Sequence, residues 1–189
     1  MSGPPNHSIS NLRDVRRYVT THREDGKAIV RSTEPGAWES VLNNELAFNV
    51  IYTTSEFPSQ MNGDADIKAH EKVAQAGTGL VNAGGSVCRI VDFAPGNDPL
   101  MHRTKSLDYG VVLEGEMEMI LDSGEVSLLK RGDVAVQRGT MHAWKNPSAT
   151  QWGRMLFVLL DAQPLQVGGA DLAEELSGAH EHGIPPSNN

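Results

Sequence analysis

The sequence predicts an all-β domain, a sandwich or a closed barrel, and three observations carry this prediction. Short segments rich in β-favouring residues follow one another along the 189 residues. Gly, Pro and Asp punctuate them, and the 19 glycines and 10 prolines are typical of a chain with many turns. Sustained helical periodicity is absent, so helices are not expected to connect the strands. Many short strands joined by turns favour a sandwich or barrel.

The expected strands cover Lys27–Val30, Phe48–Thr54, Val87–Phe93, Tyr109–Leu113, Glu116–Asp122, Val126–Leu129, Val134–Gln137 and Met155–Leu160. In the fifth of these, Met117, Met119 and Leu121 share one face and the two glutamates face the other side, as in a half-buried strand. The Asp-Ser-Gly sequence at 122–124 predicts a hairpin turn after it. One short helix is expected at Asp171–Leu176, after two glycines.

Composition sets the boundaries and excludes some partners. Residues 1–11 are polar and are expected to be a flexible N-terminal segment, 12–166 to form the barrel domain, and 167–189 to form a short helix and tail. The net charge of -8 and the lack of a Lys/Arg cluster argue against nucleic acid as a partner. The sequence shows neither a signal peptide nor a membrane span, so a cytoplasmic protein without a membrane partner is expected.

Two spaced motifs lie between Ala94 and Asn146. The first consists of Gly96, His102, Thr104, Asp108 and Gly115, and the second of Gly132, Gly139, His142 and Asn146. Together they resemble the two motifs of the cupin superfamily. Thr104 stands where that family has a second histidine, Asp108 where it has a glutamate, and Gln137 where it has a proline.

The segment His-Arg-Thr-Lys-Ser-Leu-Asp-Tyr at 102–109 is similar to one found in small single-domain cupins with the type-2 motif, several of which are encoded in fungal and bacterial polyketide pathways. The resemblance implies a cupin jelly-roll barrel with short peripheral helical segments. It also implies a homodimer and a small-molecule substrate. His102, Asp108 and His142 would form the active centre inside the barrel.

The same resemblance implies two uses for these three residues. A typical metal cupin holds its ion with three histidines and a carboxylate, so His102, Asp108 and His142 would be the remaining ligands for Fe, Zn, Mn or Ni. Thr104 offers only a neutral hydroxyl, which weakens such a site. Without a metal, the three side chains would act as an acid/base set, because burial raises the pKa of a carboxyl group and lowers that of a histidine. The sequence leaves both uses open.

A second set of residues is expected to bind the substrate: Arg103, Thr104, Tyr109, Arg138 and Trp144. Arg103 could pair with a carboxylate or enolate oxygen, and Tyr109 and Trp144 could line the cavity. Each also has a structural alternative. The neighbours of an inward-facing residue on a strand point outward, and aromatic residues often fill a barrel core.

Three functions follow from these patterns. The first is a lyase or isomerase that dehydrates, cyclises, isomerises or decarboxylates a polyketide-like intermediate by proton transfer. The second is a non-haem metal-dependent oxidoreductase or dioxygenase that uses the His/Asp/His set as ligands. The third is a cupin that binds a small ligand without turning it over.

Overall fold

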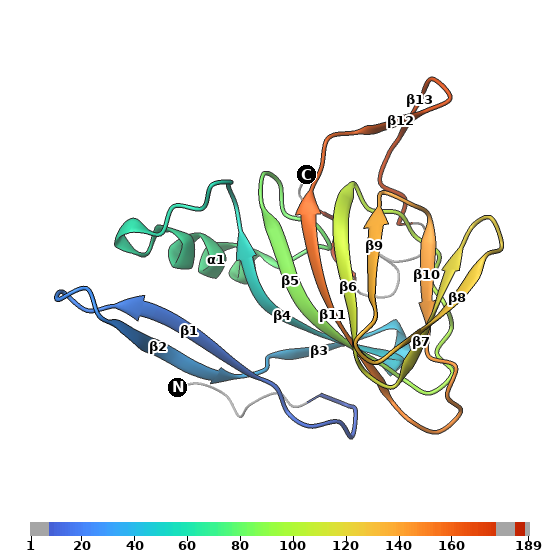
Figure 1. Ribbon diagram of the computed structural model, residues 1–189, viewed down its shortest axis with the longest axis horizontal. Coiled ribbons are helices and arrows are strands. Elements are labelled where there is room, and N and C mark those ends of the chain that lie inside the picture. The colour runs from blue at the N-terminus through green and yellow to red at the C-terminus, as the bar shows by residue number, and fades with distance from the viewer. Residues whose placement is uncertain (1–7, 177–183, 188–189) are drawn as a thin grey trace.

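The computed structural model describes residues 8–176 and 184–187 and confirms the all-β class. Within these residues it has thirteen strands, one α-helix and two short 3-10 turns (Figure 1). Every strand pair is antiparallel. The described residues contain no helix that is both long enough and apolar enough to cross a membrane.

Two sheets build the jelly-roll barrel. The larger has the order β3-β4-β5-β11-β6-β9 and the smaller the order β10-β7-β8. Their strands are β3 (Trp38–Val41), β4 (Leu46–Thr54), β5 (Ser86–Phe93), β6 (Ser106–Glu114), β7 (Glu116–Leu121), β8 (Val126–Lys130), β9 (Val134–Arg138), β10 (His142–Lys145) and β11 (Gly153–Asp161). Apolar side chains from both sheets join one core, to which Val91 on β5, Met155 on β11 and Met117 on β7 contribute. Burial of this shared core holds the two sheets together.

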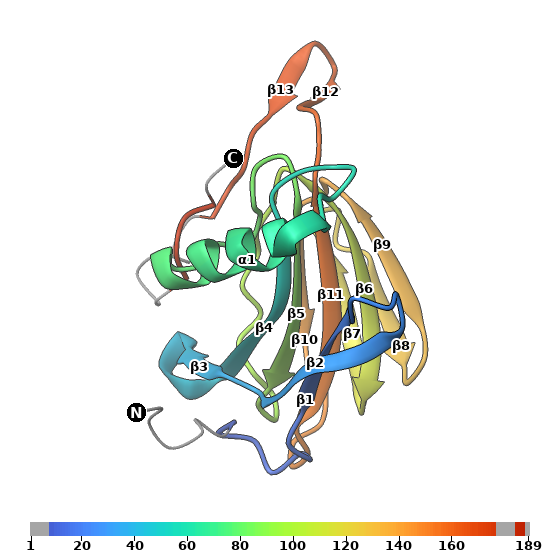
Figure 2. The ribbon, with the colours of Figure 1, turned by 90° about the vertical axis from the view of Figure 1, so that its left-hand side faces the viewer.

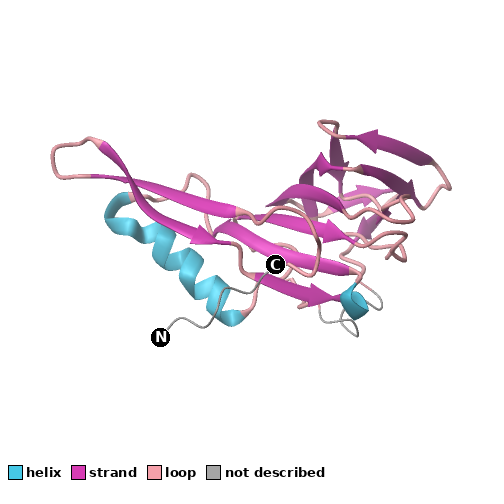
Figure 3. Ribbon diagram, turned by 90° about the horizontal axis from the view of Figure 1, so that it is seen from below, coloured by secondary structure: helices cyan, strands magenta, loops and turns pink. Residues whose placement is uncertain are grey.

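Three further units surround the barrel. Strands β1 (Arg16–His22) and β2 (Ala28–Pro35) form a hairpin that extends away from the sheets (Figures 1 and 3). Helix α1 (Ala65–Ala76) runs alongside β4 (Figure 2), and the 3-10 turns are η1 (Leu42–Asn44) and η2 (Asn62–Asp64). Near the C-terminus, β12 (Leu165–Val167) and β13 (Ala170–Leu172) form a second projecting hairpin.

The eight strands expected from the sequence are confirmed, with ends that shift by a few residues. The hairpin turn at 122–124 is also present: Gly124 lies in the left-handed region at φ 88°, and its N–H donates to Leu121 O at 3.0 Å. This conformation suits glycine, because a side chain would be strained there. Strands β1, β3, β10, β12 and β13 were not expected, since each is short or lacks clear alternation.

The expectation that sustained helices are absent is wrong for α1. Its sequence, Ala-Asp-Ile-Lys-Ala-His-Glu-Lys-Val-Ala-Gln-Ala, is rich in helix formers, but its only buried residue is the polar His70. Tyr52 stacks on the His70 ring, and the Thr53 N–H donates to His70 Nδ1 at 3.2 Å. A helix held through a histidine shows no apolar stripe in its sequence.

The short helix expected at Asp171–Leu176 is also wrong. Strand β13 covers the first two of these residues, and the chain then runs beside Arg103. Arg103 N–H donates to Glu175 O at 2.9 Å, and Glu175 N–H donates to Arg103 O at 2.8 Å. Six residues gain little from helix formation on their own, whereas this pairing satisfies the backbone and buries Leu176. The histidine pair at 180 and 182 lies outside the described residues.

A buried ion pair ties the N-terminal segment to the barrel. Arg154 on β11 donates from Nη2 to Asp92 Oδ2 on β5 at 2.7 Å, and Asp92 is fully buried. The hydroxyls of Ser8 and Ser10 donate to the same carboxylate, and Arg154 Nη1 donates to Arg13 O. Residues 8–13, at the end of the segment expected to be flexible, are therefore anchored by charge-assisted hydrogen bonds.

Removing one partner of this pair should destabilise the protein strongly. Asp92→Leu should lower the free energy of unfolding by about 3–5 kcal/mol, because Arg154 is left as an unpaired buried charge. The double variant Asp92→Leu/Arg154→Met should recover most of that loss. Urea denaturation measures both. The control is Asp25→Leu at the exposed Arg23–Asp25 pair, with a change of at most about 1 kcal/mol. A double variant as unstable as the single one would contradict this account.

Candidate active site

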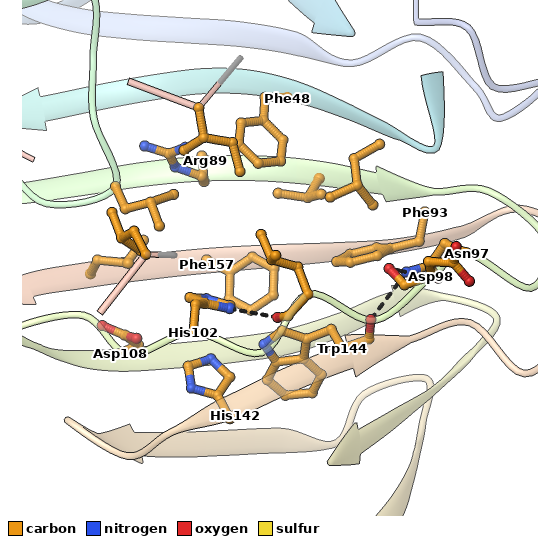
Figure 4. Close-up of a pocket in the computed structure, with 17 residues that line it drawn as sticks. Phe48, Arg89, Phe93, Asn97, Asp98, His102, Asp108, His142, Trp144 and Phe157 are labelled. Carbon is orange, nitrogen blue, oxygen red and sulfur yellow. Dashed lines mark hydrogen bonds between the residues drawn. The ribbon is translucent and has the colours of Figure 1, made fainter. Parts of the chain in front are cut away.

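A cavity lies inside the barrel (Figure 4). Its seventeen lining residues are Leu46, Phe48, Leu80, Arg89, Val91, Phe93, Asn97, Asp98, Leu100, His102, Asp108, His142, Trp144, Phe157, Leu159, Leu176 and Ile184. Most of them are apolar, with a few polar groups among them, as in small-molecule sites. His102, Asp108 and His142, the three residues expected to form the active centre, all line it.

A backbone bridge brings the two histidines together. His102 lies between β5 and β6, and His142 begins β10. The His102 N–H donates to His142 O at 2.9 Å, and the His142 N–H donates to His102 O at the same distance. In such an antiparallel pair the side chains project from the same face. The two imidazole rings are accordingly neighbours, with centroids 4.5 Å apart.

Local hydrogen bonds orient both rings in the same way. Nδ1 of His102 lies 2.9 Å from Leu100 O, and Nδ1 of His142 lies 2.9 Å from Thr140 O. A carbonyl only accepts, so each Nδ1 carries the proton in the neutral ring. Each Nε2 then keeps a free lone pair, for which the described part of the chain offers no donor. The rings thus present two proton acceptors, or two potential metal ligands.

Burial keeps both rings neutral. Desolvation and, to a smaller extent, the neighbouring His102 lower the pKa of His142 to about 4, against the hydrogen bond to Thr140, which raises it. Desolvation also lowers the pKa of His102, against the hydrogen bond to Leu100 and the charge of Glu174, which both raise it. Around pH 7 the pair is therefore uncharged, and both Nε2 lone pairs are available.

Asp108 contributes the carboxylate. It lies on β6, where Ser106, Asp108 and Gly110 alternate inward, and only 4% of its surface is exposed. Desolvation raises its pKa to about 6, although hydrogen bonds from Ser106 and Thr104 and the charge of Arg89 lower it. Its Oδ1 atom is buried and has no hydrogen-bond partner in the described residues. Such an atom is costly unless a ligand or a proton satisfies it.

Thr104, which occupies the family's second histidine position, supports Asp108. The Ser106 hydroxyl donates to Thr104 Oγ1 at 2.7 Å, and Thr104 Oγ1 makes a long contact of 3.5 Å with Asp108 Oδ2. Thr104 is buried and does not line the cavity. Its hydroxyl therefore orients one carboxylate oxygen and leaves the other free.

Aromatic rings form much of the cavity wall. The Trp144 ring lies edge-on to both His142 and Phe157, with centroids 5.9 Å and 5.6 Å away. Phe157 is accommodated by Gly110, because a Cβ at that position would come within 3.0 Å of its ring. Flat apolar walls of this kind suit a ligand with an aromatic or conjugated body.

The other residues expected to bind substrate lie mostly elsewhere. Trp144 lines the cavity, as expected, but Arg103, Tyr109 and Arg138 do not. Tyr109 follows the inward Asp108 and is 41% exposed, as strand alternation requires. Arg138 is exposed at the end of β9, and Arg103 Nε donates to Ala173 O at 2.8 Å. The substrate-binding roles of these residues stay predictions.

Two contributors to the site escaped the sequence analysis. Arg89 on β5 lines the cavity and is only 2% exposed. It alternates with Val87 and Val91, which would have placed it inside the barrel. The C-terminal segment contributes Leu176 and Ile184 to the lining, and the Oε2 atom of Glu174 is buried with no hydrogen-bond partner in the described part of the chain. No pattern in the sequence connects this segment with the cavity.

The side chains fit a metal only in part. The two Nε2 atoms are suitable donors, and Asp108 has a free carboxylate oxygen. Within the described residues, however, no group of three His, Cys, Asp or Glu side chains lies close enough together to hold one ion. This arrangement does not bring His102, Asp108 and His142 together as a ligand set, so that assignment stays a prediction.

Comparisons with known proteins place the chain in a family. Residues 89–159 match the model of the cupin domain. Phomopsin biosynthesis cluster protein D of Diaporthe leptostromiformis is 44% identical over 170 residues, which cover 89% of this chain and 90% of that protein. The cupin-domain-containing oxidoreductase virC of Hypocrea virens is 44% identical over 166 residues, which cover 86% of this chain and 84% of that protein.

Among solved structures, an RmlC-like cupin from Shewanella frigidimarina is similar at 14% identity and a TM-score of 0.44, covering 68% of this chain and 86% of that one. The family rests on the sequence relatives, which match over more than four fifths of both chains. The cupin-domain match spans β5 to β11 and includes both histidines and Asp108. The chain belongs to the cupin family.

Proposed function

We propose that this cupin is an enzyme of secondary metabolism, a lyase or isomerase that moves a proton on a small carbonyl-bearing intermediate. The observation that carries the proposal is the buried trio of proton acceptors. Asp108 has one unpaired carboxylate oxygen, and His102 and His142 each keep a free Nε2 in the same cavity. Acid/base catalysis requires proton acceptors within reach of the substrate, and the Asp108 pKa of about 6 lies close to neutral pH.

At pH 7 the resting cavity contains bases but no free acid among these three groups. Asp108, with a pKa of about 6, is mostly ionised, and both histidines are neutral. The Nδ1 protons are engaged with backbone carbonyls. A proton taken from the substrate is therefore the proton that is later returned. Such a shuttle suits an isomerisation, or an elimination in which the same proton leaves with a hydroxyl group.

The order of events follows from these states. The Asp108 carboxylate removes a proton from a carbon next to a carbonyl group, and the electron pair moves onto the carbonyl oxygen as an enolate. The histidine pair lines the same cavity, and in the proposed step the Nε2 atom of one ring accepts the proton and passes it on. The proton then returns to a different carbon, or to a hydroxyl group that departs as water.

The substrate class is inferred from the relatives. Two of them are named for the biosynthesis clusters of phomopsin and of oryzines. We infer that the substrate is a small biosynthetic intermediate with a carbonyl group. We also infer that it is polyketide-like, as the resemblance to small cupins of polyketide pathways implies. The aromatic wall formed by Trp144 and Phe157 is consistent with a conjugated substrate.

A metal-dependent oxidoreductase is the second candidate, because virC and other relatives are named cupin-domain-containing oxidoreductases. The free Nε2 atoms of His102 and His142 are the observation in its favour. A bound divalent ion would supply Lewis-acid or redox chemistry there. A third protein ligand would require a rearrangement, since the described residues do not present one in place.

Chelator treatment and removal of oxygen distinguish the proton-transfer enzyme from the metal-dependent oxidoreductase. The proton-transfer enzyme should retain its activity after EDTA treatment and dialysis, and under an oxygen-free atmosphere. The assay follows exchange of the methylene protons of phenylpyruvate in D2O by NMR, with elemental analysis of untagged protein in parallel. An apoprotein that is inactive and is restored by one divalent ion would favour the oxidoreductase instead.

Substitutions in the trio should slow that exchange. Asp108→Asn, His102→Ala and His142→Ala should each lower the rate by about 10²–10⁴-fold, because each removes a proton acceptor. Arg131→Met, at an exposed position on the β8–β9 turn, serves as the matched control and should leave the rate unchanged. Exchange that is equally fast in all three site variants would rule out their assigned roles.

The raised pKa of Asp108 also predicts a change in stability. Above pH 6 the fold disfavours the ionised form of Asp108. This cost decreases as the pH falls through the folded pKa and disappears below the ordinary value of 3.8, where the carboxyl group is protonated in both the folded and the unfolded state. Asp108→Asn should therefore raise the free energy of unfolding at pH 7.5 by up to about 3 kcal/mol, and by little at pH 4. Urea denaturation at the two pH values measures this. Equal gains at both would contradict burial as the cause.

A further inference from the structure

Arg89 is a buried cation that the structure leaves largely unsatisfied. It lies on β5, lines the cavity and is 2% exposed. One of its guanidinium nitrogens, Nη2, donates to Gly79 O, and the group lies over the Phe48 ring at 5.2 Å. Its Nε is buried and has no hydrogen-bond partner in the described residues. Burial lowers its pKa to about 10, so it stays charged near neutrality.

Among the residues that the structure describes, no side chain neutralises this charge directly. Within residues 8–176 and 184–187, no carboxylate forms a salt bridge with Arg89. Asp108 faces the same cavity and interacts with Arg89 only through their charges. By contrast Arg154, the other deeply buried arginine, has a carboxylate partner in Asp92. A buried cation without such a partner is costly, and proteins keep few of them.

The position of Arg89 suits a ligand. It lies on the opposite side of the cavity from His142, and toward the same end as Asp108 (Figure 4). A molecule in the cavity would reach the guanidinium with one end and the histidine pair with another part. A guanidinium has five N–H donors, of which the described residues use one, so a carboxylate or enolate oxygen finds free donors there.

We propose that Arg89 binds an anionic oxygen of the substrate, a carboxylate or an enolate, while the conjugated body of the substrate lies between Phe48, Trp144 and Phe157. This rests on the proposed proton-transfer function and names its substrate class. When the Asp108 carboxylate removes the neighbouring proton, the positive charge of the Arg89 guanidinium lowers the energy of the enolate that forms. This type of contact was expected of Arg103, which does not line the cavity.

Paired probes test the charge requirement without any turnover. Cinnamate is compared with its neutral amide, and the enolate of 4-hydroxycoumarin with neutral coumarin, by titration calorimetry at pH 7.5. The wild-type protein should bind at least one anion about 10- to 100-fold more tightly than its neutral partner, as expected for hydrogen bonds to a buried charge. The pair that shows the preference identifies carboxylate or enolate. No preference in either pair overturns the proposal.

Variants locate the preference. Arg89→Met should abolish the preference and leave the affinity for the neutral compounds within about 3-fold, because methionine fills similar space without charge. Arg89→Lys should retain part of it, since the ammonium lacks the planar fork. Arg131→Met, which removes an exposed arginine, is the matched control. If Arg89→Met does not fold, as judged by circular dichroism, Arg89→Lys decides: an undiminished preference would place the anion elsewhere and overturn the proposal.

The failure of this proposal differs from the failure of the proposed function. If the anions are preferred and Arg89→Met removes the preference, but phenylpyruvate exchange is absent, the anion site stands and the proton-transfer function fails. If exchange depends on Asp108 while cinnamate and its amide, and the coumarin pair, bind equally, the function stands and the anion site fails.

Discussion

The desolvation of four ionisable side chains in one apolar cavity is the constraint on which the site depends. Arg89, His102, Asp108 and His142 line a space whose other walls are mainly Leu, Val, Phe, Trp and Ile. Burial disfavours every charged form, and it shifts the pKa of Asp108 up and those of both histidines down. The protein tolerates this because hydrophobic burial elsewhere exceeds the cost, and such costs are typical of functional sites.

Backbone pairing explains how groups so far apart in sequence meet. His102 and His142 are forty residues apart, yet two reciprocal hydrogen bonds fix their Cα positions and place both rings in the cavity. Strand alternation does the same for Asp108 and Arg89 on β6 and β5, two strands that both pair with β11. The C-terminal segment is held by its pairing with Arg103 and adds Leu176 to the lining. The site is therefore built on the rigid sheets and completed by one irregular segment.

Much of this could be read from the sequence, and the exceptions have physical reasons. Alternation and turn residues identified eight of the thirteen strands in the described residues. The motif spacing identified three site residues that line one cavity. Helix α1 was missed because its buried residue is His70. Arg89 was missed because a charged residue in a strand is usually expected on the surface, whereas β5 is buried on both of its faces. Long-range pairing of the C-terminal segment leaves no local pattern at all.

The exchange of histidine for threonine at position 104 gives the carboxylate a different setting. A histidine there would compete for the space beside Asp108, whereas the Thr104 hydroxyl, supported by Ser106, contacts Oδ2 and leaves Oδ1 unpaired. Across the cavity the Arg89 guanidinium is also incompletely paired. Two opposite charges that face one apolar space without contacting each other are each poorly stabilised. A ligand with an anionic oxygen and an acidic C–H group would place the oxygen against the Arg89 guanidinium and the C–H group against the Asp108 carboxylate. Such a molecule would relieve the cost of burying both charges, and the cavity would therefore bind it in preference to a neutral one.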